Sequence, residues 1–584
     1  MKDEVTKDAY LRNNEYYRRQ EEFDYLYQQS VKGRKFKNLV ERILNPLNLR
    51  LAYRNIKNNK GKNAKGVSGK SLNWISSMLL KVYIIYITMR IINYQPEMIR
   101  RVEIPKDNGK VRCLGIKEPI DKIIEQAIYQ MLEPIVTAKF HNNSNGFIRG
   151  RNAKRALAQM ENYIKREKLY FIVDIDIKGF FDNIDHGKLL KQLWSLGIED
   201  KNLLSIISKM LKAEVLGIGE MTKGTPQGGI LSPLLANVVL NELDWWLDSK
   251  KNKGIRFVRY ADDFKIICPS YQVAKNMLEK VIKWLSSRLK LQVSEEKTKI
   301  VNLKRNYSEF LGFKIKVKRK KDTYVIVSHI KDNALTKLEK SAKKRIRQIK
   351  KCKNNPNLLG KIIERYNSFV VGVHNYYDYA TEISYDLSHI NWIIENYIMF
   401  KLGDVLSFKD CLKSEKLSKK YCKGEKPLFT IRENTLIPIG NVKHNFRKYR
   451  GNKINYFDSN TRKCFHKNLQ IKNEYMIDKL LENPYMDESV EFNDNIVPVF
   501  CGQLGKYKIT KEYMFNPDNI KVTKIRTNGS DKYDNIIIVN KQVFKLLNIR
   551  GDDIIENMRY SENQNETQLR EINRIRKENN LLLI

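Results

Sequence analysis

The stretch RFVRYADDFKIIC at residues 256–268 limits the fold most strongly, because it predicts two short strands joined by a tight turn. Its apolar and β-branched flanks are typical of strands, and the turn carries Asp262 and Asp263. Such a hairpin holds both carboxylates at its tip, where they can bind a divalent metal. An Asp-Asp pair is also common in surface turns, so a metal site needs a third carboxylate.

The segment YFIVDIDIKGFFDNIDH at residues 170–186 supplies further carboxylates. Its apolar, β-rich beginning predicts a buried strand that carries Asp174 and Asp176. A strand that ends on an acid beside a hairpin with two acids can hold two Mg²⁺ ions for phosphoryl transfer. A solvated turn and helix-capping aspartates are the alternative interpretation.

Five segments, in this order, resemble the reverse transcriptases encoded by group II introns: DIKGFFDNIDH, GTPQGGILSPLLAN, RYADDF, SEEKTKI and FLGF. The likeness covers most of the first 400 residues. It implies an α+β right-hand polymerase with fingers and a palm that contains an antiparallel sheet. A helical thumb and maturase domain and small DNA-binding and HNH-like modules would follow. The implied reaction is RNA-directed DNA synthesis with two Mg²⁺ ions, for which Mn²⁺ is a substitute.

The resemblance assigns roles to residues of the palm. Asp176, rather than Asp174, aligns with the family's metal ligand. Lys297 is similar to the lysine near the leaving pyrophosphate, although a surface cation is the equal alternative. Asp182 and Asp185 are expected to cap the following helix. The implied metal ligands are Asp176, Ile177, Asp262 and Asp263, and the implied catalytic residues are Asp176, Asp262, Asp263 and Lys297.

Other residues are implied to bind the incoming deoxynucleotide. Residues 100–116 predict a hairpin with the turn Asp107-Asn108-Gly109, whose cations would be triphosphate ligands in the fingers. Phe180 or Phe181 would lie under the sugar, where a bulky ring blocks a 2′-hydroxyl, although such a ring is usually core. The implied nucleotide ligands are Lys106, Arg112, Phe180 and Gln227.

Two segments resemble RNA-binding parts of the family. HNNSNGFIRGRNAKRAL at 141–157 is similar to the template-contacting loop, and the likeness supports Arg151 better than Arg149. From residue 331 onward, the segment NALTKLEKSAKKRIRQIKKCK predicts a basic amphipathic helix with its apolar stripe at Leu335, Leu338, Ile346 and Ile349. IIERYNSFVVGVHNYYDYA at 362–380 resembles the maturase domain, which implies a folded group II intron RNA as partner. The implied RNA and template ligands are Arg151, Arg365, Asn375 and Tyr376.

The last hundred residues resemble an HNH endonuclease without its catalytic residues. Thr523 and Lys524 stand where that family has a histidine pair, and no histidine follows His466. An HNH site needs histidine as general base and as metal ligand, so we predict that nuclease activity is absent. The preceding region mixes aromatic residues with cations, which suits either DNA contact or a flexible basic linker.

Charge indicates the kind of partner. The chain has 108 Lys and Arg against 66 Asp and Glu, a formal net charge of +42, which favours nucleic acid. The longest apolar run, at 77–87, is interrupted by Lys81 and too short to span a membrane, so no membrane partner is expected. The seven cysteines are scattered singly, and the first residues lack a secretory signal. We expect reduced thiols in a bacterial cytoplasm, with an organelle matrix as the alternative.

These patterns together predict five regions: an N-terminal extension (1–98), fingers and palm (99–320), thumb and maturase (321–404), a DNA-binding region (405–480) and a degenerate HNH-like domain (481–584). The predicted function is target-primed reverse transcription together with splicing and retrohoming of an intron. The implied partners are intron RNA, an RNA template with a DNA primer, target DNA and dNTPs, and a homodimer is left open. A splicing-only maturase and a reverse transcriptase recruited to defence or repair are the alternatives.

Overall fold

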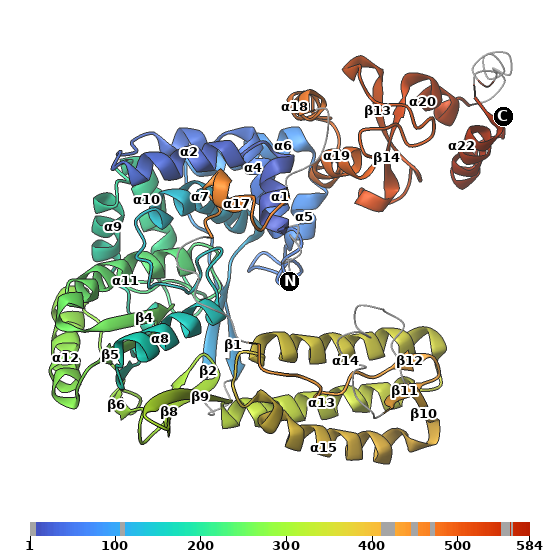
Figure 1. Cartoon of the computed structure of the whole chain (residues 1–584). Coiled ribbons are helices and arrows are strands. Elements are labelled where there is room, and N and C mark those ends of the chain that lie inside the picture. The colour runs from blue at the N-terminus through green and yellow to red at the C-terminus, as the bar shows by residue number, and fades with distance from the viewer. Residues whose placement is uncertain are drawn as a thin grey trace.

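The computed structural model describes residues 8–105, 111–409, 427–445, 454–467, 474–550, 561 and 564–584. Seen as in Figure 1, the chain has the outline of an open C. N-terminal helices and C-terminal residues form the upper arm, the palm forms the back, and helices α13–α15 form the lower arm. No helix in the described part is both long and apolar enough to cross a membrane.

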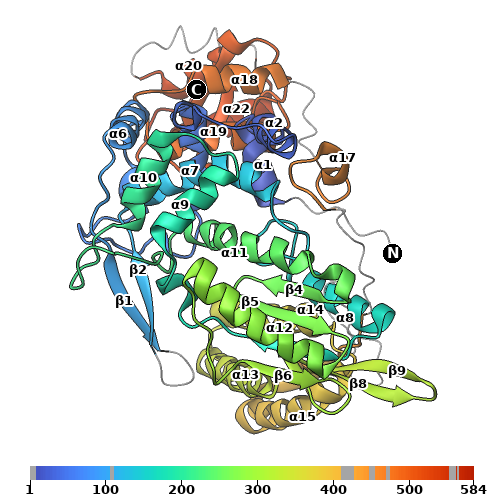
Figure 2. The same ribbon diagram turned by 90° about the vertical axis from the view of Figure 1, so that its left-hand side faces the viewer.

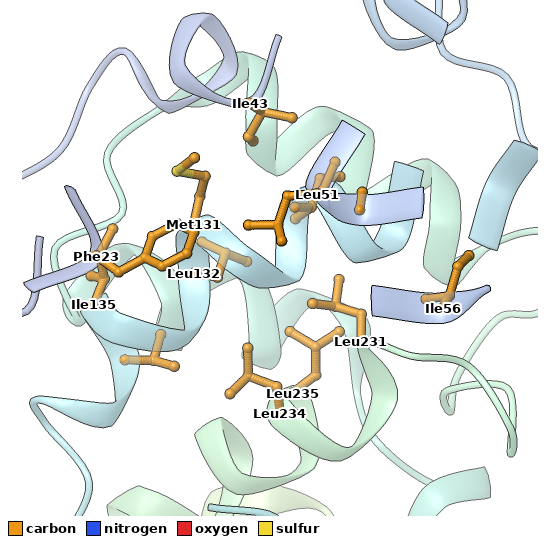
Figure 3. Close-up of a cluster of buried hydrophobic side chains, with 14 of the residues drawn as sticks. Phe23, Ile43, Leu51, Ile56, Met131, Leu132, Ile135, Leu231, Leu234 and Leu235 are labelled. Carbon is orange, nitrogen blue, oxygen red and sulfur yellow. The ribbon is translucent and has the colours of Figure 1, made fainter. Parts of the chain in front are cut away.

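A helical core forms the upper arm. Its helices are α1 (Ala9–Tyr16), α2 (Gln20–Val31), α3 (Leu39–Ile43), α4 (Pro46–Ile56), α5 (Leu72–Ser76), α6 (Leu80–Ile92) and α7 (Pro119–Thr137). Helix α7 is buried along nearly its whole length. Figure 3 shows Leu51 of α4 and Met131 of α7 in one cluster with Leu231, which precedes α11. The fingers and the N-terminal helices therefore share one hydrophobic core.

The predicted fingers hairpin is confirmed. Strand β1 (Arg100–Pro105) pairs antiparallel with β2 (Val111–Ile116), and Ile104 lies opposite Arg112. The turn, with Lys106 and Asp107-Asn108-Gly109, lies outside the described residues, as does the side chain of Arg112. Their predicted contact with a triphosphate stays a prediction.

The palm is a four-stranded antiparallel sheet in the order β4-β5-β3-β6. Its strands are β3 (Phe171–Ile175), β4 (Arg256–Tyr260), β5 (Asp263–Cys268) and β6 (Lys299–Asn302). Val173 on one face belongs to the core of the fingers, whereas Ile172 on the other face belongs to the core of the thumb. The surrounding helices are α8 (Ala153–Glu167), α9 (His186–Ser195), α10 (Lys201–Leu211), α11 (Ser232–Asp248) and α12 (Tyr271–Trp284). The α+β right-hand polymerase fold is thus confirmed.

The lower arm is the thumb. It begins with β7 (Ser308–Phe310), β8 (Phe313–Lys320) and β9 (Thr323–Ile330) and continues with α13 (Asp332–Cys352), α14 (Pro356–Tyr377) and α15 (Ile383–Leu402). The apolar stripe predicted for α13 is confirmed, because Ile346 and Ile349 are buried and Leu335 and Leu338 pack against them. The domain limit predicted at residue 320 falls in the turn between β8 and β9, which pair along their whole length.

The described C-terminal residues pack against both arms. Strands β10 (Leu406–Lys409), β11 (Leu428–Ile431) and β12 (Asn434–Thr435) join the thumb core. Helices α17 (Ser459–Arg462), α18 (Glu474–Glu482) and α19 (Val490–Gly502) lie on the upper arm (Figure 1). Beyond them, β13 (Ile520–Lys524) and β14 (Ile536–Asn540) form a hairpin that is followed by α20 (Lys541–Asn548) and α22 (Glu566–Glu578).

Buried ion pairs fix the C-terminal residues to the N-terminal helices. Asp494 of α19 is 3% exposed. It accepts from Arg54 Nη1 at 2.8 Å and from the Tyr17 hydroxyl at 2.6 Å. Arg462 of α17 likewise forms a two-pronged pair with Asp24, at 2.9 and 2.8 Å. A cation of the predicted DNA-binding region is therefore engaged within the protein.

Candidate polymerase site

The palm sheet brings the predicted carboxylates to the same end of its strands. Ile175, the last residue of β3, pairs with Phe264, so Asp176 follows β3 at the end of the sheet where Asp263 begins β5. Asp262 lies in the two-residue turn between β4 and β5, after Ala261 with its left-handed φ of 58°. The side chain of Ile177 is a hydrocarbon without donor atoms, so only its backbone carbonyl could serve as a metal ligand.

Lysines contact two of these carboxylates. Lys297 Nζ lies 2.9 Å from Asp176 Oδ2, and Lys265 Nζ lies 3.3 Å from Asp263 Oδ1. Within the described ranges, no three acidic, histidine or cysteine side chains are grouped closely enough to hold a metal ion. The oxygen donors and their strand positions suit Mg²⁺, and each lysine contact involves only one oxygen of its carboxylate.

Lys265 was not singled out in the sequence, yet it is buried beneath the turn. Its Nζ lies 3.3 Å from Asp174 Oδ1 as well as from Asp263, and Asp174 also accepts from Ser308 Oγ at 2.9 Å. Burial alone lowers the pKa of Lys265, but the two carboxylates outweigh this effect and raise the pKa. Lys265 therefore stays charged, and Asp174 has a structural partner.

A buried arginine holds the turn from the other face of the sheet. Arg259 is 1% exposed and pairs with Asp244 of α11, with Nε and Nη2 at 2.7 and 2.5 Å from the two carboxylate oxygens. Its Nη1 donates to the carbonyl of Ala261 and to Asn237 Oδ1, both at 2.8 Å. These bonds tie the backbone of the turn to α11.

The loop at residues 143–147 packs directly on the same turn. The backbone amide of Asn145 donates to the Arg259 carbonyl at 2.8 Å, and Asn237 Nδ2 donates to the Gly146 carbonyl at 2.8 Å. A Cβ on Gly146 would lie 2.2 Å from the Ala261 nitrogen, so only glycine permits this approach. Phe147, with a φ of 57°, is 49% exposed and presents a ring beside the turn.

The arginines after this loop support it. Arg151 Nη1 donates to the carbonyls of His141 and Ser144, at 2.8 and 2.7 Å. Arg149 pairs with Glu133 and lies 3.4 Å from the centre of the Tyr10 ring. Template contact by Arg151 stays a prediction.

The nucleotide-binding predictions need one correction. Phe180 is 3% exposed and packs in the core, whereas Phe181 is partly exposed, so Phe181 is the ring that could contact a sugar. A turn of 3₁₀-helix over Phe180–Asp182 sends the two rings in different directions. Gln227 Nε2 donates to Asp182 Oδ1 at 3.2 Å.

The predicted helix caps are half right. Asp185 caps α9, since its carboxylate accepts from the Lys188 amide at 2.7 Å. Asp182 does not cap the helix, because it ends the preceding 3₁₀ turn, where its carboxylate accepts from the Gln227 side chain.

The maturase residues line one exposed side of α14. Arg365, Gly372 and Tyr376 are spaced by seven and four residues, which places them on the same side, with the exposed Asn375 beside them. The Tyr376 hydroxyl donates to the Leu311 carbonyl at 3.0 Å. Burial and the hydroxyls of Tyr377 and Tyr260 raise the pKa of Tyr376 to about 12. Because Tyr260 ends strand β4, this end of α14 reaches the palm.

The HNH-like region has an ion pair where that family has its histidines. Lys524 Nζ lies 2.6 Å from Asp531 and 3.5 Å from Glu488. Thr523 lies opposite Ile537 in the hairpin. The likeness to a decayed nuclease stays a prediction.

The fold and the three carboxylates are typical of template-directed polymerases. Residues 104–315 match the family described as reverse transcriptase (RNA-dependent DNA polymerase). This part of the chain is therefore a reverse transcriptase domain, and the resemblance to the enzymes of group II introns is confirmed by relatives that carry intron names.

Three relatives illustrate this similarity. The group II intron-encoded protein LtrA of Lactococcus lactis subsp. cremoris is 32% identical over 351 residues, which cover 49% of this chain and 57% of LtrA. Protein YkfC of Escherichia coli is 28% identical over 49% of this chain and 84% of its own. A COX1/OXI3 intron 2 protein of Saccharomyces cerevisiae is 26% identical over 59% of this chain and 49% of its own. The chain thus spans little more than half the length of LtrA.

Proposed function

We propose that this chain is an RNA-directed DNA polymerase that also binds a group II intron RNA as a maturase. The observation that carries the proposal is that Asp176, Asp262 and Asp263 stand at the same end of neighbouring strands in the palm of a reverse transcriptase domain. The intron-encoded relatives support the intron RNA as partner.

The residues at the palm edge have distinct proposed roles. Asp176, Asp262, Asp263 and the Ile177 carbonyl would hold two Mg²⁺ ions, or Mn²⁺, which activate the primer hydroxyl and stabilise the leaving pyrophosphate. Lys297, which lies beside Asp176, would donate a proton to that pyrophosphate. The ring of Phe181 would exclude a 2′-hydroxyl.

Nucleic acid would bind along the thumb and the fingers. The basic helix α13 and the exposed side of α14 suit an RNA backbone, and the net charge of +42 suits intron RNA, an RNA template with a DNA primer, and target DNA. Splicing and retrohoming by target-primed reverse transcription would follow in a bacterial cytoplasm or an organelle matrix.

A reverse transcriptase recruited to defence or repair is the second candidate. The ion pair of Lys524 with Asp531 favours it, because an intron enzyme with a working nuclease would not fill that place with a bound lysine. The genomic context separates the two, since an open reading frame inside a structured intron supports only the first.

Primer extension with Asp176→Asn and Asp262→Asn tests the proposal. Loss of a metal ligand should lower the rate at least about 10³-fold, while binding of intron RNA stays unchanged. Asp322→Asn, in the turn of the β8–β9 hairpin, is the matched control and should extend normally. Undiminished extension by either palm variant would overturn the assignment.

A further inference from the structure

The first residue of α9, His186, is a buried histidine that holds the loop at residues 223–229, which we call the Gln227 loop. His186 is 7% exposed, and its Nε2 lies 2.7 Å from the carbonyl oxygen of Gly224. A carbonyl oxygen can only accept, so Nε2 carries the proton and donates. Nδ1, the other ring nitrogen, is buried and has no hydrogen-bond partner among the residues that the structure describes. Burial of an acceptor without a partner is unfavourable, so an apolar side chain would pack at lower cost, and the bond to the Gln227 loop is what histidine provides instead.

The Gln227 loop also bonds the segment that carries Phe181. The Thr225 amide donates to the Phe181 carbonyl at 2.7 Å, and the Gly224 amide donates to the Ile184 carbonyl at 2.7 Å. A Cβ on Gly224, whose φ is 87°, would lie 2.8 Å from a carbonyl oxygen of that segment, so the two backbones are in close contact. His186 and Phe181 are therefore bonded to neighbouring residues of one loop.

The far end of the Gln227 loop reaches the fingers. The Gly115 amide of β2 donates to the Gln227 carbonyl at 2.8 Å. Just beyond the loop, the Ile230 amide donates to the Glu125 carboxylate of α7 at 2.9 Å. Figure 2 shows α9 between the palm strands and the N-terminal helices of the upper arm. The loop therefore bridges the fingers and the palm, and α9 holds it on the palm side.

We infer that His186 is a positioning residue that sets the distance between the Phe181 ring and the Gln227 loop, and thereby the selection of deoxynucleotides over ribonucleotides. This role rests on the proposed polymerase function, which assigns Phe181 to the sugar and Gln227 to the incoming nucleotide. A 2′-hydroxyl adds a single oxygen atom, and contact energies change steeply over about 1 Å. A small displacement of the loop, and of the Phe181 backbone bonded to it, is therefore enough to admit a ribose.

Three substitutions of His186 separate its hydrogen bond from its packing. His186→Leu removes the donor and keeps most of the volume. His186→Asn keeps a polar side chain, but its amide reaches only to the place of Nδ1. The longer amide of His186→Gln reaches the place of Nε2 and can donate to the Gly224 carbonyl. Gln192→Leu is the matched control, because Gln192 lies on the same helix, is also 7% exposed and donates to the Val239 carbonyl of α11 at 3.2 Å.

Single-nucleotide incorporation by the full chain measures the effect. A DNA primer on an RNA template is extended with dATP or with ATP in Mg²⁺, and the ratio of the two kcat/KM values gives the selectivity. This ratio should fall at least about tenfold in His186→Leu and His186→Asn, and return to within about threefold of wild type in His186→Gln. The KM for dATP should rise in the first two variants while kcat changes little, because the carboxylates keep their places. Gln192→Leu should alter stability in urea and leave the ratio unchanged.

A double-mutant cycle with Phe181→Ala tests whether His186 acts through the ring. Removal of the ring should lower the selectivity by itself. Adding His186→Leu to Phe181→Ala should lower the selectivity no further, because both changes act on the same contact with the sugar. A role in stability alone predicts no such dependence, since it would slow the incorporation of both nucleotides alike.

Failure of the polymerase proposal and failure of this inference give different results. A wild-type protein that extends no primer would refute the proposed function and the role of His186 with it. Normal wild-type extension with an unchanged ratio in His186→Leu and His186→Asn would overturn the inference alone. An equal loss in His186→Gln, or a further loss on the Phe181→Ala background, would do the same. Thermal unfolding shows which variants are folded, and if His186→Leu is not, the contrast between His186→Asn and His186→Gln decides.

Discussion

Replacement of Gly146 by alanine should disturb the catalytic turn without touching a carboxylate. An alanine Cβ would lie 2.2 Å from the Ala261 nitrogen and 2.9 Å from its Cα. Ordinary contact begins at 3.4 Å, so the two backbones must separate by about 1.2 Å, the difference between 3.4 and 2.2. Both clashing atoms belong to the backbone, so no side-chain rotation can relieve them.

The expected effect on the rate exceeds the effect on stability. Overpacking of this kind costs about 1–3 kcal/mol of unfolding free energy. A displacement of about 1 Å at reacting groups lowers a rate on the order of 10²-fold. The turn carries Asp262, so this carboxylate is displaced by the full distance if the turn moves and the loop stays in place. Asn237 holds the loop through the Gly146 carbonyl and the turn through Arg259. Because neither segment is held more firmly than the other, we expect the displacement to be shared between the loop and the turn.

Single-turnover primer extension on RNA measures this effect. Gly146→Ala should extend about 100-fold more slowly, with unchanged affinity for the primer–template and a modest loss of stability in urea. Gly61→Ala is the matched control, because no atom lies within 4 Å of its added Cβ. Extension at the wild-type rate would show that the loop yields instead, and would refute the view that it sets the position of the turn.

Three further predictions concern stability, partners and the C-terminal region. Asp244→Asn leaves the buried Arg259 without its carboxylate, so the free energy of unfolding in urea should fall by about 3–5 kcal/mol, and an unchanged value would show that the pair is dispensable. Affinity for intron RNA should fall about 10³-fold or more between 50 and 200 mM salt if six phosphates are bound, and a flat dependence of filter binding on salt would argue against a nucleic-acid partner. The chain with its intron RNA should not cut the bottom strand of an end-labelled target duplex in Mg²⁺ or Mn²⁺, because no histidine follows His466 and Lys524 is bound by Asp531. Specific cleavage that is lost on truncation at residue 480 would reveal a divergent nuclease.

The palm was predictable because its strands and acids are defined by short contiguous segments of the sequence. Apolar residues are concentrated in Phe171–Ile175 and on both sides of the YADD turn, as is typical of buried strands. The acids stand immediately after a strand or within a turn, so antiparallel pairing alone brings them together. The amphipathic helix α13 was predicted for a similar reason, since its one apolar side defines its buried surface.

Properties that depend on distant partners could not be predicted. The choice between Phe180 and Phe181 depends on a 3₁₀ turn that the spacing of the motif does not reveal. The docking of the C-terminal residues depends on Asp494, whose partner Arg54 lies 440 residues away. The resemblance to the template-contacting loop assigns Arg151, and less well Arg149, to the template, but their hydrogen bonds to backbone carbonyls and to Glu133 appear only once the loop is folded.

Two charged residues within apolar strands, Arg259 and Lys265, could nevertheless have indicated buried ion pairs from the sequence alone. Arg259 and Lys265 flank the YADD turn within strands whose neighbours are buried. A buried charge is costly unless it is paired, so each implied a carboxylate packed against the sheet. Because successive residues point to opposite faces, Arg259, paired in register with Phe264, and Lys265 lie on different sides of the sheet. Asp244 meets the first from α11 and Asp174 meets the second from β3, so the turn that carries Asp262 is held from both faces before any metal binds.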